Sequence, residues 1–91
     1  MDVPLVADLL IQNKKGLHAR ASAKFVQCVD QFDADVTVTR EGQTVSGTSI
    51  MGLMMLGAGI GSTIRIEATG VEAQAAMDGI AALVNGLFGE D

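Results

Sequence analysis

The only histidine of the chain, His18, lies in a sequence context suited to phosphoryl chemistry. Gly16 precedes it, a helix-forming segment follows it, and Arg20 comes two residues later. Imidazole is a nucleophile, and guanidinium is a permanently charged group that binds phosphate oxygens. The first N–H groups of a helix have no intrahelical acceptor and favour an anion. We therefore expect a phosphoryl group on His18, bound by Arg20 and by the backbone N–H groups of Ala19, Arg20 and Ala21.

Charge is distributed unevenly along the sequence. The net charge is −5, from 11 acidic and 6 basic residues, which argues against nucleic-acid binding. Four of the six basic residues nevertheless flank the histidine: Lys14, Lys15, Arg20 and Lys24. A locally positive region on an acidic chain is suited to steering an acidic protein partner. For Lys15 and Lys24, a solvated lysine without a partner is an equally open interpretation.

Hydrophobic periodicity predicts the element order βαββαβα. The predicted strands are 3–11, 34–39, 43–46 and 62–68, and the predicted helices are 19–31, 49–55 and 71–88. The apolar stripe of the last helix continues to Leu87 and Phe88. We expect one α+β domain over residues 1–91, an open-faced sandwich with three helices on one face of a four-stranded antiparallel sheet.

The short helix at 49–55 combines a capping serine with a run of apolar side chains. Ser49 is expected to accept a hydrogen bond from a backbone N–H of the first turn. Ile50, Met51, Met54 and Met55 are more apolar groups than two helical turns bury, so we expect Met51 and Met55 to face solvent as a docking patch. The alternative is that all four pack on the sheet.

With this element order, the sequence resembles the HPr family, the histidine-containing phosphocarriers of the bacterial phosphoenolpyruvate-dependent phosphotransferase system. Residues 16–20 (Gly-Leu-His-Ala-Arg) have the form of the family's phosphohistidine motif, and residues 49–57 that of its serine-helix motif. The resemblance implies that His18 accepts a phosphoryl group at Nδ1 from phosphorylated enzyme I and passes it to an IIA-type domain. Arg20 would stabilise the phosphate. It also implies a carrier that is a substrate of other proteins rather than an enzyme.

The resemblance further implies that Ser49 is phosphorylated by a regulatory HPr kinase in some bacteria; a plain N-cap is the alternative. A phosphate there would add negative charge to the partner surface. The sequence departs from the family pattern at two positions. Ala21 stands where proline is frequent, and alanine should preserve the helix. Thr48 stands where lysine is frequent before the serine, which weakens the case for kinase recognition but not for the histidine chemistry.

Several function classes are disfavoured by composition. One cysteine, Cys28, excludes an internal disulfide, and one histidine with one cysteine offers no metal site. We expect no cofactor, no signal peptide and no membrane insertion. The predicted protein is a cytoplasmic monomer that docks on its partners through Lys24, Ile50, Met51 and Met55. Two roles stay open beside sugar uptake: a nitrogen-related regulatory branch, and an interaction module controlled at Ser49.

Overall fold

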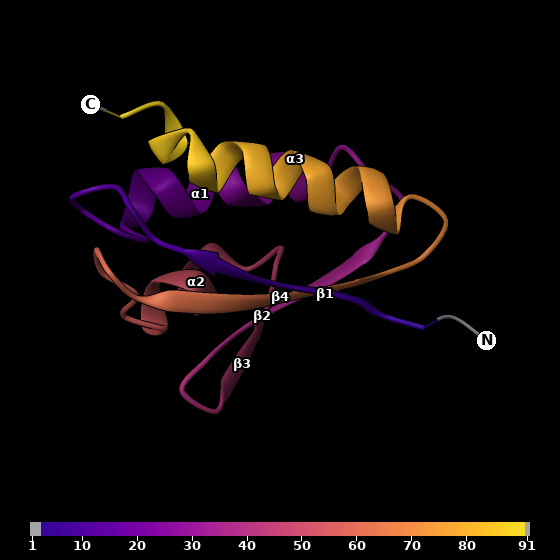
Figure 1. Ribbon diagram of the computed structural model, residues 1–91, viewed down its shortest axis with the longest axis horizontal. Coiled ribbons are helices and arrows are strands. Elements are labelled where there is room, and N and C mark those ends of the chain that lie inside the picture. Colours follow the sequence, from indigo (N-terminus) through magenta and orange to yellow (C-terminus); the bar gives the residue numbers. More distant parts are fainter. Residues whose placement is uncertain (1–2, 91) are drawn as a thin grey trace.

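The computed structural model describes residues 3–90, and its elements follow the predicted order (Figure 1). The strands are β1 (Leu5–Leu10), β2 (Asp35–Arg40), β3 (Gln43–Ser46) and β4 (Thr63–Thr69). The helices are α1 (Ala19–Val29), α2 (Ile50–Met55) and α3 (Ala73–Asn85), with a 3-10 turn, η1 (Leu87–Gly89), at the end. None of the helices within 3–90 is long and apolar enough to cross a membrane.

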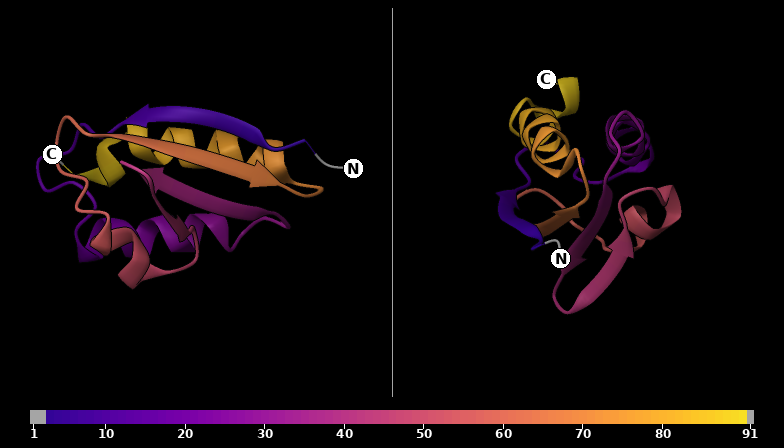
Figure 2. Two further views of the ribbon diagram at one scale, coloured as in Figure 1. Left: turned by 90° about the horizontal axis from the view of Figure 1, so that it is seen from below. Right: turned by 90° about the vertical axis from the view of Figure 1, so that its right-hand side faces the viewer.

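The four strands form one antiparallel sheet in the order β1-β4-β2-β3. In β4, Ile64 pairs with Leu9 of β1, and Ile66 pairs with Val38 of β2. The helices lie together on one side of this sheet, as the end-on view in Figure 2 shows. The α+β open-faced sandwich is therefore confirmed.

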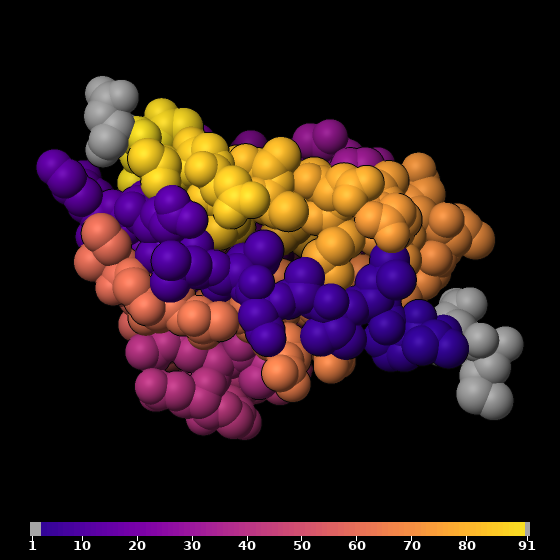
Figure 3. Space-filling model, viewed as in Figure 1, coloured from indigo at the N-terminus to yellow at the C-terminus, as the bar shows by residue number. Residues whose placement is uncertain are grey.

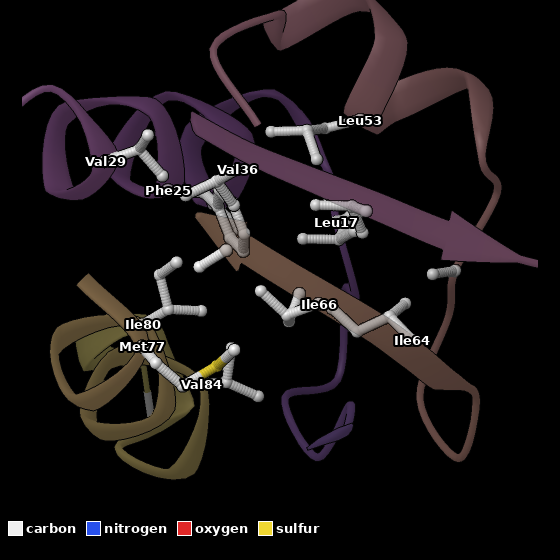
Figure 4. Packing of buried hydrophobic residues seen from close by; sticks show 14 of the residues in the cluster. Leu17, Phe25, Val29, Val36, Leu53, Ile64, Ile66, Met77, Ile80 and Val84 are labelled. Carbon is white, nitrogen blue, oxygen red and sulfur yellow. The ribbon is translucent and has the colours of Figure 1, made fainter. Parts of the chain in front are cut away.

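The core lies between the sheet and the helices. The inward residues of β4 that the alternation predicts, Ile64, Ile66 and Ala68, are fully buried. Phe25 of α1 and Ile80 of α3 pack toward them, also without exposed surface (Figure 4). The residues of this cluster come from α1, α3 and the sheet, so the cluster holds α1 against the sheet. His18 immediately precedes the first residue of α1.

Several element ends differ from prediction. Val3 is 84% exposed and lies outside β1, and Val71 is 85% exposed and precedes α3. Helix α1 ends at Val29 rather than at Gln31. After Val29 the chain forms a turn in which Gln31 N–H donates to Cys28 O at 3.2 Å. Cys28 itself is half-buried against the core, and burial raises the pKa of its thiol. Cys28 thus packs as a small hydrophobic residue.

The last helix, α3, is shorter than its apolar stripe predicts. It ends at Asn85 with Gly86 as its C-cap, and the next two residues, Leu87 and Phe88, have positive φ values of 59° and 54°. Each such residue costs about 1–2 kcal/mol. The turn places Phe88 in the core without exposed surface, and complete burial of such a side chain contributes about 1.5–3 kcal/mol. Lys24 Nζ donates to Phe88 O at 2.6 Å, a charge-assisted bond that offsets the remaining cost.

The loop before α1 lies directly against the loop between α2 and β4. Leu17 N–H donates to Ala58 O at 2.9 Å, and the Leu17 side chain is buried. Gly16 has φ +62°, and a Cβ there would overlap Ala58 O and lie 2.7 Å from Gly59 Cα. Only glycine fits this close backbone approach.

We predict that Gly16→Ala destabilises the protein by about 2–5 kcal/mol, since it combines a left-handed residue with a backbone overlap. Gly42→Ala is the matched control: Gly42 also has a positive φ (80°), but a Cβ there meets no atom within 4 Å. The control should cost only about 1–2 kcal/mol. Urea unfolding of both variants measures the difference, and equal losses would show that the loop contact contributes nothing.

Candidate functional site

His18 is the N-cap residue of α1. Its backbone is extended (φ −74°, ψ −179°), and its carbonyl accepts the first helical hydrogen bond, from Ser22 N–H at 2.9 Å. The N–H groups of Ala19, Arg20 and Ala21 precede that bond and therefore have no acceptor within the helix. The imidazole does not cap the helix, and its side chain is 26% exposed. The expected arrangement of an imidazole beside a helix N-terminus is thus present.

The backbone on which His18 depends is fixed by Ser22, in the first turn of α1. Ser22 is fully buried, and its Oγ donates to Leu17 O at 3.1 Å. Leu17 in turn donates its N–H to Ala58 O. The residue immediately before the histidine therefore has both backbone polar groups paired, so the position of His18 is set by its neighbours.

Glu90 is the site residue that sequence analysis misses. Its Oε2 contacts Nε2 of His18, and its Oε1 accepts a hydrogen bond from Nδ2 of Asn13 at 3.1 Å. These hydrogen bonds, first that to His18 and then that to Asn13, lower the pKa of the Glu90 carboxyl below its usual value. Glu90 is 72 residues from His18 in the chain and beyond the last apolar periodicity, so no local pattern links the two.

The C-terminal segment lies against the loop before α1 at one end of the molecule, as the yellow and indigo-to-purple surfaces in Figure 3 show. A depression there is lined by Lys14, Lys15, His18, Arg20, Lys24 and Glu90. All four basic residues that flank His18 in the sequence are thus brought together. Lys24 is held by its bond to Phe88 O, whereas Arg20 is exposed. The depression offers a mainly positive surface next to a ring nitrogen.

Helix α2 lies beside the histidine and has the predicted cap. Ser49 Oγ accepts a hydrogen bond from Gly52 N–H at 2.9 Å, which confirms it as the N-cap. Met51 and Met55 are 73% and 67% exposed, which confirms that they face solvent. Ile50 and Met54 are also exposed, at 40% and 44%, so only Leu53 of this helix is fully buried.

The apolar surface of α2 is continuous with the histidine site. A second, shallow depression is lined by Lys15, His18, Met54 and the Gly57–Gly59 segment. A partner that covers His18 would therefore also meet methionine side chains. Such side chains are flexible and polarisable, which suits contact with differently shaped surfaces.

Comparison with known proteins agrees with this geometry. Residues 6–86 match the family described as PTS HPr component phosphorylation site. The phosphocarrier protein HPr of Cupriavidus necator is 51% identical over 86 residues, which cover 94% of this chain and 97% of the relative. The phosphocarrier protein NPr of Shewanella violacea is 42% identical over 94% of both chains.

Solved structures of HPr proteins have the same fold as this chain. A crystal structure of HPr from Thermoanaerobacter tengcongensis matches with a TM-score of 0.91 and 34% identity, covering 96% of this chain and 98% of that one. The family match spans nearly all of the chain and includes the histidine and serine segments. The chain belongs to the HPr family of phosphocarrier proteins of the phosphotransferase system.

Proposed function

We propose that His18 accepts a phosphoryl group from phosphorylated enzyme I and passes it to an IIA-type domain. The observation that carries this proposal is the position of the only histidine, partly exposed beside a helix N-terminus and among basic side chains. Phosphoryl transfer needs a nucleophile in line with phosphorus and fixed positive groups around the equatorial oxygens. The nucleophile and the positive groups that support this proposal lie in the first turn of α1 and the loop before it.

In the proposed reaction, Nδ1 of His18 attacks phosphorus while the bond from phosphorus to the donor breaks. The phosphoryl oxygens then accept hydrogen bonds from the N–H groups of Ala19, Arg20 and Ala21 and from the Arg20 guanidinium. Ala21 has an N–H that a proline at this position would lack. One guanidinium and a helix N-terminus hold the group only moderately, which suits a carrier that must release it.

Docking on both partners is assigned to the exposed face beside His18. Ile50, Met51 and Met55 supply apolar contact area, and Lys24 supplies positive charge at its edge. Lys24 keeps this charge while its Nζ is bonded to Phe88 O. An acidic partner surface with an apolar centre is complementary to this face. Brief encounters of this kind need no second copy of the chain, so we propose a monomer that acts as a substrate rather than as a catalyst.

A regulatory role for Ser49 is compatible with the same face. Its Oγ lies at the start of α2, next to the exposed methionines, and the helix N-terminus would stabilise a phosphate there. The added charge would repel an acidic partner without unfolding the protein. A kinase would have to recognise the site with Thr48 in front of it.

A nitrogen-related regulatory branch is the second candidate for this carrier. It is favoured by the likeness to a protein named NPr, although the identity to a protein named HPr is higher. In this role the chain would act mainly as an interaction module. The two candidates share the histidine chemistry and differ in the acceptor, so phosphoryl transfer from this chain to purified IIA domains of each branch separates them.

The central prediction concerns His18 and Arg20. With enzyme I and phosphoenolpyruvate, the wild type should gain one acid-labile phosphoryl group by mass spectrometry, and His18→Ala should gain none. Arg20→Ala should slow the reaction by about 10- to 100-fold, because a charge-assisted hydrogen bond contributes about 1.5–3 kcal/mol.

Arg65→Ala is the matched control, since Arg65 is exposed on the sheet and bonded to Asp8. It should react like the wild type. Phosphorylation of the His18→Ala variant would refute the assignment, and equal effects of the two arginine variants would remove Arg20 from the site.

A second prediction tests Ser49. Ser49→Asp should keep the cap, because aspartate is a good N-cap residue, but should raise the KM for enzyme I by about tenfold through charge repulsion. Ser49→Ala should behave in the opposite way, losing about 1 kcal/mol of stability with an unchanged KM. An unchanged KM for Ser49→Asp would exclude control of docking at this position.

A further inference from the structure

Glu90 lies on a C-terminal segment that tertiary contacts hold in place. The preceding Phe88 is fully buried, and its carbonyl is bonded to Lys24 Nζ. Glu90 itself donates its N–H to Leu87 O at 2.9 Å. These contacts hold the last described residues near the start of α1, so the Glu90 side chain meets the imidazole from a backbone position set by tertiary contacts.

Asn13 holds the same carboxylate from the other side. It is only 2% exposed, and its Nδ2 donates both to Gly16 O (2.9 Å) and to Glu90 Oε1 (3.1 Å). Because both partners are acceptors, the amide nitrogen must point toward them. Its buried Oδ1 has no hydrogen-bond partner within residues 3–90. The side chain thus acts here through its two N–H groups, which tie Glu90 to the loop before His18.

This contact specifies which ring nitrogen carries the proton. An ionised carboxylate only accepts hydrogen bonds, so Nε2 of His18 must donate its hydrogen to Glu90 Oε2. In the neutral ring the other nitrogen, Nδ1, then has the lone pair. The nucleophile required for phosphoryl transfer is therefore selected by a residue at the far end of the chain.

We propose that Glu90 is a positioning residue: it fixes the Nε2–H form of His18 and balances the positive charge of the phosphorylated ring. This inference rests on the proposed function and deepens it. Asn13 serves the same purpose by holding the carboxylate in place.

The electron and proton balance of the transfer explains why the Nε2–H form beside Glu90 is advantageous. When the Nδ1 lone pair forms the N–P bond, the donor's bond to phosphorus breaks and its electron pair leaves with the donor. The ring keeps its Nε2 proton and becomes cationic, next to the Glu90 carboxylate. When the group is passed on, the N–P pair returns to Nδ1 and a neutral imidazole remains. No proton has to enter or leave the ring in either direction.

Glu90 also adds negative charge near an incoming phosphate, which opposes the reaction. The two effects differ in distance, because the carboxylate touches Nε2 while phosphorus binds on the Nδ1 side of the ring. Arg20 and the helix N–H groups additionally compensate the phosphate charge. The direct contact should therefore dominate, and removal of Glu90 should slow phosphorylation.

The test uses the full-length protein and phosphoramidate, a small phosphoryl donor that needs no docking surface and releases ammonia. Phosphorylation is followed by mass spectrometry, and the ring tautomer by ¹⁵N NMR, in which the single histidine gives one set of signals. Glu90→Ala should slow the reaction by about tenfold, as loss of a ring-orienting carboxylate does elsewhere. Its neutral ring should change from the Nε2–H form to a mixture of both forms.

Two further variants complete the design. Glu90→Gln keeps an oxygen that accepts from Nε2–H, so it should retain the tautomer and recover part of the rate. Glu67→Gln removes an equal charge from β4, outside the histidine depression, and should match the wild type. Urea unfolding verifies that each variant is folded.

An unchanged or increased rate in Glu90→Ala would overturn the inference, as would a slower rate with an unchanged tautomer. A Gln variant no faster than the Ala variant would also contradict it. Failure of the proposed function has a different signature, since enzyme I with phosphoenolpyruvate would then leave His18 of the wild type unmodified, whatever the result with phosphoramidate.

Discussion

The structure of the site depends on one backbone contact between two loops. The chain before α1 passes so close to the Ala58–Gly59 segment that Gly16 has no space for a Cβ. The hydrogen bond from Leu17 N–H to Ala58 O joins these loops. This contact sets where α1 begins, and hence where His18 lies. It also places α2, which precedes Ala58 in the chain, beside the histidine. The proposed docking face and the proposed nucleophile are therefore positioned by the same interaction.

A second constraint is electrostatic. The chain is acidic, with a net charge of −5, but four of its six basic residues surround His18. Glu90 lies among them and contacts the ring, so the site within residues 3–90 combines a carboxylate with a positive region. A site with only positive groups would bind phosphate more tightly and release it more slowly. A mixed site of this kind fits a carrier, for which acceptance and release are equally important.

Much of the fold could be predicted because it rests on local periodicity. The alternation of β4 identifies its buried residues, and Ser49 identifies the start of α2. The end of α3 could not be predicted, because the apolar stripe continues to Phe88 while the helix does not. The left-handed turn at Leu87 and Phe88 is stabilised by burial and by Lys24, which are tertiary contacts.

In the site, too, the residues with a local sequence signal could be predicted and those placed by tertiary contacts could not. The motif around His18 identifies the ring, Arg20 and the helix N-terminus from neighbouring residues. Glu90 and Asn13 have no such signal, since one lies 72 residues from the histidine and the other is an ordinary loop residue by sequence. Their contribution appears only when the C-terminal turn brings them together. The residues that contact the ring directly or through Glu90 are thus less visible in sequence than the histidine itself.

The identity of the phosphorylated ring nitrogen is the most direct test of the proposed mechanism. Long-range ³¹P–¹⁵N and ¹H–¹⁵N NMR correlations on the phosphorylated, ¹⁵N-labelled protein assign it without ambiguity, because the chain has one histidine. We predict phosphorus on Nδ1 and a proton on Nε2, which faces Glu90. Phosphorus on Nε2 would contradict this prediction, since that nitrogen would have to leave the carboxylate before it could react.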